Sequence, residues 1–239
     1  MPRSRREKIR DITRAEIKET ARQLMAEKGT AGISLRAIAR RMGMTAPALY
    51  HYYAGLNDLI TALIQDAFTQ LADTLEMAAA EQAHATYAAR LVAVALANRR
   101  WALDHPVDFQ LIYGNPIPQY EQPTDITYPP ARRSFLVTAR LFTAAIANGE
   151  LELPPAYKQL PAGITDSLRQ LTTVEGHDLP LPALYLAAIA WTRIHGHVML
   201  ELFNLIQPVI SDVEAYFQYE VQVFLQQVGF QISDKEKQK

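Results

Sequence analysis

Cysteine is absent from this chain of 239 residues, which excludes disulfides, thiolate metal sites and cysteine nucleophiles. Long uncharged segments are absent too. The longest stretches without Asp, Glu, Lys or Arg are residues 42–57, with 16 residues, and residues 179–192, with 14 residues of which two are prolines. Both are too short to span a bilayer. The N-terminus is basic but lacks the apolar segment of a secretory signal. We therefore expect a cytoplasmic protein that does not enter the membrane.

The net charge of −1 conceals an uneven distribution along the chain. Residues 1–60 carry 12 basic and 6 acidic side chains, whereas the remaining 179 residues carry 12 basic and 19 acidic ones. A basic N-terminal part on an acidic body indicates that the N-terminal part meets an anionic partner. Nucleic acid is the leading candidate.

Apolar residues recur at helical spacing along nearly the whole chain, and no segment alternates like a half-buried strand. The pattern predicts an all-α protein with a boundary near residue 57, between a domain of three helices in residues 1–56 and a larger helical domain in residues 57–239. The five prolines of residues 114–130 predict an irregular segment. Two strong helices are predicted at Leu181–Leu205 and Ser211–Val228. A turn at residues 176–178 separates them from the preceding part, and a frayed charged tail follows them.

Two short helices follow the first long one. Ser34 is a plausible N-cap of the first, and Gly43 would end it. Thr45 would open the second, with Pro47 in its first turn, where a missing N–H costs nothing. This is the outline of a helix-turn-helix, whose second helix enters the major groove of DNA.

Each polar side chain of this pair has a predicted role in DNA binding. Ser34 turns amides toward a phosphate, and Arg36 is placed to bind a guanine edge. Thr45, Ala46 and Pro47 form a tip suited to a thymine methyl, while Tyr50, His51 and Tyr52 donate to phosphates. The alternative is a helix pair in a bundle that never binds DNA, with the tyrosines as core aromatics. The charge asymmetry favours DNA.

The run GISLRAIARRMGMTAPALYHYY, residues 32–53, closely resembles the DNA-binding domain of the TetR family of bacterial repressors. The resemblance implies that side chains at the positions of Arg36, Ala46, Pro47 and Tyr50 approach bases. It also implies backbone contacts at the positions of Ser34, Thr45, Tyr50 and Tyr52. One position departs from the family: where a lysine usually opens the fourth helix and binds a phosphate, this chain has Leu56.

The C-terminal part resembles the regulatory half of such repressors, in particular a subgroup with a Trp-x-x-x-His-Gly signature, here residues 191–196. The resemblance implies a homodimer through the last two helices and a pocket for a small apolar effector. Without it, two alternatives stand: these helices bury their faces within one subunit, and the aromatics of the body are core. The candidate ligand-binding residues are Trp101, Phe109, Tyr113, Phe135, Phe142, Tyr185, Trp191 and His195.

No enzyme motif is present: the chain has no G-x-S-x-G elbow, no phosphate-binding glycine loop and no H-E-x-x-H. His195 and His197 point to different sides of a helix, which argues against a shared metal with Glu201. We expect no cofactor and no catalysis. The prediction is a ligand-responsive transcriptional regulator that binds a palindromic operator, most simply a repressor. The alternative is an activator, or a small-molecule-binding helical protein with weak or conditional DNA binding.

Overall fold

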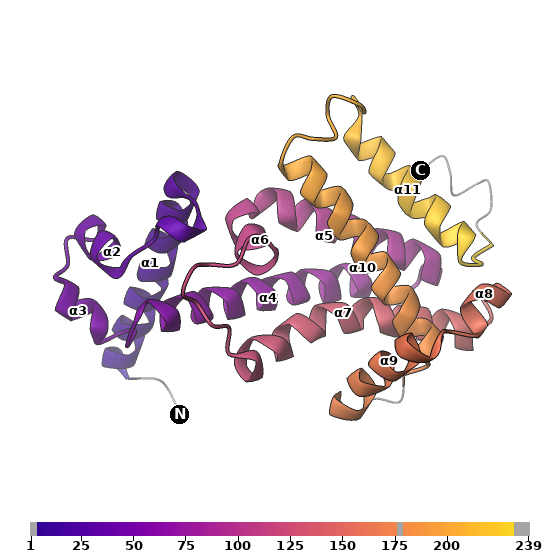
Figure 1. The fold of residues 1–239 in the computed structure, drawn as a ribbon, viewed down its shortest axis with the longest axis horizontal. Coiled ribbons are helices and arrows are strands. Elements are labelled where there is room, and N and C mark those ends of the chain that lie inside the picture. Colours follow the sequence, from indigo (N-terminus) through magenta and orange to yellow (C-terminus); the bar gives the residue numbers. More distant parts are fainter. Residues whose placement is uncertain (1–3, 176–178, 232–239) are drawn as a thin grey trace. The chain divides into compact units, whose positions relative to one another are not determined.

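A computed structural model describes residues 4–175 and 179–231; the predicted turn at 176–178 and most of the predicted tail lie outside these ranges. Within them the chain is helical, and its extended pairing is a single bridge between Leu151 and Phe230 (Figure 1). The predicted all-α fold is therefore confirmed. None of the described helices combines the length and apolar composition needed to cross a membrane.

The helices divide into two compact units that do not follow chain order. Unit 1 comprises Met1–Gln70 and His105–Pro130, and unit 2 comprises Leu71–Asp104 and Ala131–Lys239. Helix α4 (Leu56–Glu81) is continuous between them in sequence. The predicted boundary after residue 56 falls at the start of α4, within unit 1.

Unit 1 begins with α1 (Arg5–Lys28), whose first turn is closed by a capping box between Ser4 and Glu7. The helix ends at Gly29, which has φ +78° and whose N–H donates to the Met25 carbonyl at 2.8 Å. The buried face of α1 is the predicted apolar stripe, Ile17, Ala21, Leu24 and Met25. A 3₁₀ turn at Thr30–Gly32, α2 (Leu35–Arg41) and α3 (Ala46–Tyr50) follow and lie beside α1 (Figure 1).

Helix α6 (Pro106–Tyr113) belongs to unit 1 and contacts α1. The Arg22 Nε–H of α1 lies 2.9 and 3.1 Å from the two carboxylate oxygens of Asp108 on α6, and both side chains are largely buried. Asp66 of α4 accepts from Lys18 and lies 3.8 Å from Arg22 Nη2. Three helices of unit 1 are thus joined by one set of charges.

The predicted irregular segment 114–130 is wrong in its second half, because α7 (Thr124–Ala147) already includes Pro129 and Pro130. A proline within a helix lacks the N–H that would reach the carbonyl four residues back. Here the Ile126 carbonyl, four residues before Pro130, accepts instead from Gln65 Nε2 at 3.4 Å. This tertiary bond replaces a local one, so the local signal alone was misleading.

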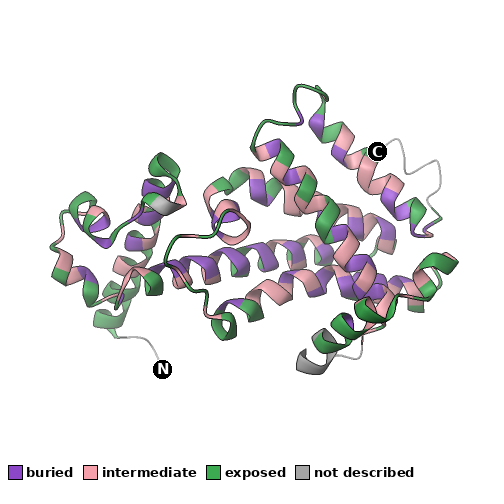
Figure 2. Cartoon of the chain, in the orientation of Figure 1, coloured by how far each residue is buried: buried purple, intermediate pink, exposed green. Residues whose placement is uncertain are grey.

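Unit 2 contains α5 (Tyr87–Asp104), most of α7, α8 (Pro155–Lys158), α9 (Ala162–Glu175), α10 (Leu181–Leu202) and α11 (Val213–Gln227). The two predicted C-terminal helices are confirmed, with slightly shorter ends. Both α10 and α11 pack on α5, and Figure 2 shows that their buried residues lie on one side of each helix.

Candidate nucleic-acid interface and ligand cavity

The α2–α3 pair forms as its local signals predict. The Ser34 hydroxyl accepts from the Ala37 N–H at 3.2 Å, which confirms the predicted cap. Helix α2 ends before Gly43, whose φ of +65° lies in the left-handed region that favours glycine. Pro47 lies in the first turn of α3. The Thr45 side chain makes no capping hydrogen bond, so its hydroxyl is free of that role.

The residues of the α2–α3 pair that pack against the rest of unit 1 differ in burial from those that face solvent. Leu49 is fully buried and Tyr53 nearly so, which fixes one side of α3 against the unit. The predicted DNA-contacting residues are on the solvent side. Ala46 and Tyr52 are half-buried, and the following six are exposed: Ser34, Arg36, Thr45, Pro47, Tyr50 and His51.

The three arginines of α2 differ in what they can bind. Arg41 donates to both carboxylate oxygens of Glu27 at 2.7 Å, and this hydrogen bonding lowers the pKa of Glu27. The side chains of Arg36 and Arg40 are exposed and make no ion pair or hydrogen bond with any residue that the structure describes. Sequence reasoning could not separate the three, because Glu27 is 14 residues away on α1. Two cations of α2 are therefore available to an external anion.

The end of α3 is tied to α1 through its backbone. Arg14 donates to the Tyr52 carbonyl from Nη2 at 2.8 Å and from Nε at 3.3 Å, and its guanidinium lies 5.1 Å from the Tyr53 ring centroid. Burial raises the pKa of the Tyr53 hydroxyl. The orientation of α3 is thereby fixed at its C-terminal end as well as by Leu49.

The start of α4 differs from the family pattern in charge as well as in residue type. Leu56 occupies the first position of the helix. Asp58 Oδ2 accepts from the Ala54 N–H at 3.0 Å, so a carboxylate caps this end of α4. An approaching phosphate would meet this carboxylate without a lysine to offset it.

The eight predicted ligand-binding residues do not converge on one cavity. In unit 1, Phe109 and Tyr113 pack together, with ring centroids 5.2 Å apart. In unit 2, Tyr185 packs on Tyr157 at 6.2 Å. The rest of the set also belongs to unit 2: Trp101 buried in α5, Phe135 half-buried in α7, Phe142 buried in α7, and Trp191 and His195 paired at 5.6 Å in α10.

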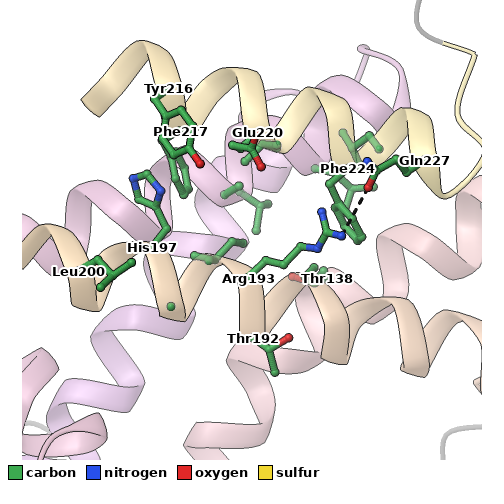
Figure 3. A pocket seen from close by; sticks show the side chains of 18 of the residues that line it. Thr138, Thr192, Arg193, His197, Leu200, Tyr216, Phe217, Glu220, Phe224 and Gln227 are labelled. Atoms are coloured by element: carbon green, nitrogen blue, oxygen red, sulfur yellow. Dashed lines mark hydrogen bonds between the residues drawn. The ribbon is translucent and has the colours of Figure 1, made fainter. Parts of the chain in front are cut away.

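A cavity of about 530 Å³ in unit 2 lies between α10 and α11 over α5 and α7 (Figure 3). Of the predicted ligand-binding residues, Phe142 alone lines it. Its floor is apolar, formed by Leu91, Val94 and Ala95 of α5 together with Phe142. The exposed lining residues mark its mouth: Thr192, Arg193, Gly196, Leu200 and Gln227.

The polar groups of the cavity come from both long helices. Figure 3 shows Arg193 extending from α10 toward Gln227 of α11; its Nη2 lies 3.4 Å from Gln227 Oε1, and its guanidinium lies 4.8 Å from the Phe224 centroid. The His197 ring lies 4.6 Å from the Phe217 ring, and burial lowers the pKa of this histidine. This wall was not among the predictions from the sequence. The helical spacing of Ala190, Arg193, His197 and Leu200, at steps of three and four residues, could have indicated that they share one side of α10.

Beside His197, a buried ion pair joins α5 to α10. Arg99 donates to the two oxygens of Glu201 at 2.6 and 2.8 Å, and both side chains are about nine-tenths buried. His197 Nε2 lies 3.7 Å from the same carboxylate. The Arg99–Glu201 ion pair therefore joins α5 to α10 next to His197, which lines the cavity.

Comparison with known proteins decides the family. The model of the tetR family of bacterial regulatory proteins matches residues 17–63, and that of the tetracyclin repressor-like C-terminal domain matches residues 91–224. The HTH-type transcriptional regulator Rv1816 of Mycobacterium tuberculosis is 32% identical over 201 residues, which cover 84% of this chain and 85% of the relative. This chain belongs to the TetR family.

Solved structures agree with this TetR-family assignment. The crystal structure of the regulatory protein SCO4313 is 36% identical, with a TM-score of 0.76, and the match covers 95% of this chain and all of that one. A protein of unknown function from Rhodococcus sp. RHA1 shares the fold, with 23% identity, a TM-score of 0.69 and coverage of 90% and 95%. TetR-family proteins are transcription regulators with a DNA-binding helix-turn-helix domain and a ligand-binding domain, not enzymes.

Proposed function

We propose that this TetR-family regulator is a homodimeric repressor that binds a palindromic operator and is released by a small apolar effector. The observation that carries the proposal is the difference in burial within the α2–α3 pair: Leu49 is buried, while Arg36, Thr45 and Tyr50 are exposed to solvent. The Trp-x-x-x-His-Gly subgroup is part of the proposal. It rests on residues 191–196 of α10.

The DNA-contacting roles are those that the family resemblance implies, and the exposure of six of the eight side chains supports them. Arg36 has no partner among the described residues and can bind a guanine edge with two hydrogen bonds. Ala46, Pro47 and Tyr50 approach bases from α3, while Thr45 and Ser34 contact the backbone. His51 and Tyr52 contact phosphates at the end of α3. In a dimer, two copies of α3 would read half-sites one helical turn, or a multiple of it, apart.

The side of α10 at the mouth of the cavity fits a subunit interface. Gly196 and Leu200 are exposed there, as is Phe203 at the end of the helix. Apart from the neighbouring residues of α10 itself, no atom in the described ranges lies within 4 Å of a Cβ built on Gly196. Glycine in the middle of an exposed helix costs about 1 kcal/mol relative to alanine. A second helix crossing closely at Gly196 would account for this residue. Tyr219 of α11 is exposed as well, and supports an interface built from both helices.

The effector site that fits this interface is the cavity between α10 and α11. Its volume lies within the ~300–1,000 Å³ range of small-molecule sites, and its floor is apolar. A ligand there would contact both helices of the proposed interface. It can shift the dimer between DNA-bound and released forms only by its difference in affinity for the two.

Selection from random duplex DNA with the purified chain tests the proposed function. We expect a palindrome whose binding weakens steeply with salt, because Lys and Arg contacts release counterions. An activator would also select a palindrome, so transcription from a promoter carrying the selected site decides the sign of regulation. Recovery of no sequence would favour a ligand-binding protein with conditional DNA binding, as Leu56 and Asp58 at the start of α4 suggest.

Arg36→Ala is expected to cost roughly 1–3 kcal/mol at the selected site and to relax the preference at one base pair. The reason is that the substitution removes the guanidinium group that would make a bidentate contact to a base edge. Binding to the selected duplex and to single-base variants measures both effects. An equal loss on random DNA would show that Arg36 contacts only phosphate.

Ala190→Leu is expected to reduce binding of an apolar dye, 1-anilinonaphthalene-8-sulfonate, by about tenfold or more, because the larger side chain would occupy part of the cavity. DNA binding should persist. Ala147→Leu, which adds the same volume at an exposed position of α7, is the matched control. Unchanged dye fluorescence in Ala190→Leu would place the apolar site outside this cavity.

A further inference from the structure

The buried face of α1 changes from apolar to cationic toward the N-terminus. Ile17, Ala21 and Leu24 are at most 3% exposed and pack into unit 1. Arg14, Arg10 and Arg6 continue the same face at steps of three and four residues. The side of α1 that faces its own unit therefore carries arginines where the helix extends past the core.

The position of this arginine stripe relative to α3 is fixed by Arg14, which donates to the Tyr52 carbonyl at 2.8 Å. Arg10 and Arg6 lie one and two turns farther out, about 6 and 12 Å along the helix axis. Both are exposed, and neither makes an ion pair or hydrogen bond with any residue in the described ranges. Two uncompensated guanidinium groups thus extend beyond the C-terminal end of α3.

Apart from Arg36 and Arg40 of α2, the helix-turn-helix surface offers few cations to a phosphate. Leu56 stands where the family usually has a lysine, and Asp58 caps the same helix end. Arg41 is held by Glu27. A DNA-bound α3 would place phosphates at both of its ends, and the cations beyond its C-terminal end are those of α1.

We propose that Arg6 and Arg10 bind backbone phosphates of DNA immediately outside the half-site read by α3, so that α1 is a second DNA-binding element. This inference rests on the proposed DNA-binding function. Guanidinium groups bind phosphate oxygens through paired N–H donors, so the two arginines supply the contact that Leu56 cannot make. These contacts extend the length of duplex that the protein covers, and because they are made to the backbone they add no sequence preference.

The chain offers a matched control on the same two turns. At 100° per residue, Lys8 lies on nearly the opposite side of α1 from Arg10, and Arg5 lies 100° from Arg6. Both are exposed. Arg6→Gln/Arg10→Gln and Arg5→Gln/Lys8→Gln remove the same charge from the same helix end. The two double variants therefore remove equal charge from different faces of α1, and they differ otherwise only in that one removes a lysine in place of an arginine.

The experiment measures the dissociation constant of each full-length variant over a range of salt, on duplexes carrying the selected palindrome with and without flanking base pairs. For Arg6→Gln/Arg10→Gln we expect the slope of log K against log salt to fall by about two per subunit, with affinity about tenfold or more lower. Trimming the flanks should weaken the native chain and leave this variant unchanged. Arg5→Gln/Lys8→Gln should keep most of the native slope and the sensitivity to flanks.

Equal slopes in the two double variants would overturn the inference, because they would show a general effect of charge and not contacts from one face. Native affinity in Arg6→Gln/Arg10→Gln would overturn it as well. Failure of the native chain to bind any duplex would instead overturn the proposed function, and with it this inference. Thermal unfolding followed by circular dichroism checks that both variants keep the native helix content.

Discussion

Leu200→Glu is expected to convert the proposed dimer into monomers. Leu200 is 45% exposed in the single subunit and lies on α10 at the mouth of the cavity, near Gly196. In a symmetric interface the substitution would bury two carboxylates, one from each copy. Desolvation of each costs several kcal/mol, so we expect the dimer dissociation constant to rise at least about a hundredfold. Sedimentation velocity across micromolar concentrations measures the change.

Trp191→Glu is the matched control for this experiment. Trp191 is also 45% exposed, but nine residues separate it from Leu200, which places it on the opposite side of α10. We expect this variant to remain a dimer. Operator affinity should fall in Leu200→Glu, because a monomer reads a single half-site. A dimeric Leu200→Glu protein would contradict the proposed interface.

Asp108→Ala is expected to destabilise the protein by about 3 kcal/mol, because it leaves the largely buried Arg22 without its main partner. Asp66, 3.8 Å from Arg22 Nη2 and already bound to Lys18, can compensate in part. The contact that would be lost joins α1 to α6 within unit 1. Unfolding in urea, followed by circular dichroism, measures the loss.

Two further variants separate the buried ion pair from the surrounding charges. Asp66→Ala should cost under about 1 kcal/mol, because the Asp66 carboxylate is one-third exposed and solvent screens it. Arg22→Met/Asp108→Leu should recover most of the stability lost in Asp108→Ala, since an apolar pair of similar size leaves no buried charge unpaired. A small loss in Asp108→Ala, equal to that of Asp66→Ala, would show that Arg22 finds water in the native state.

The sequence by itself determined the features that depend on neighbouring residues. The Ser34 cap, the helix end before Gly43 and the place of Pro47 all follow from backbone and side-chain chemistry within four residues, and all are found. Helical periodicity likewise gave the long helices of the body. The TetR resemblance of residues 32–53 rests on the same local pattern, and the family comparison confirms it.

The tertiary structure alone decided which groups meet. It pairs Arg41 with Glu27 and leaves Arg36 unpaired, and it supplies Gln65 to the carbonyl that Pro130 cannot bond. It also distributes the aromatic candidates over separate clusters and forms the cavity from residues of four helices. The spacing of residues along one helix determines on which side of that helix each residue lies. Which other helix lies against that side depends on packing between segments far apart in the chain, and no local signal encodes it.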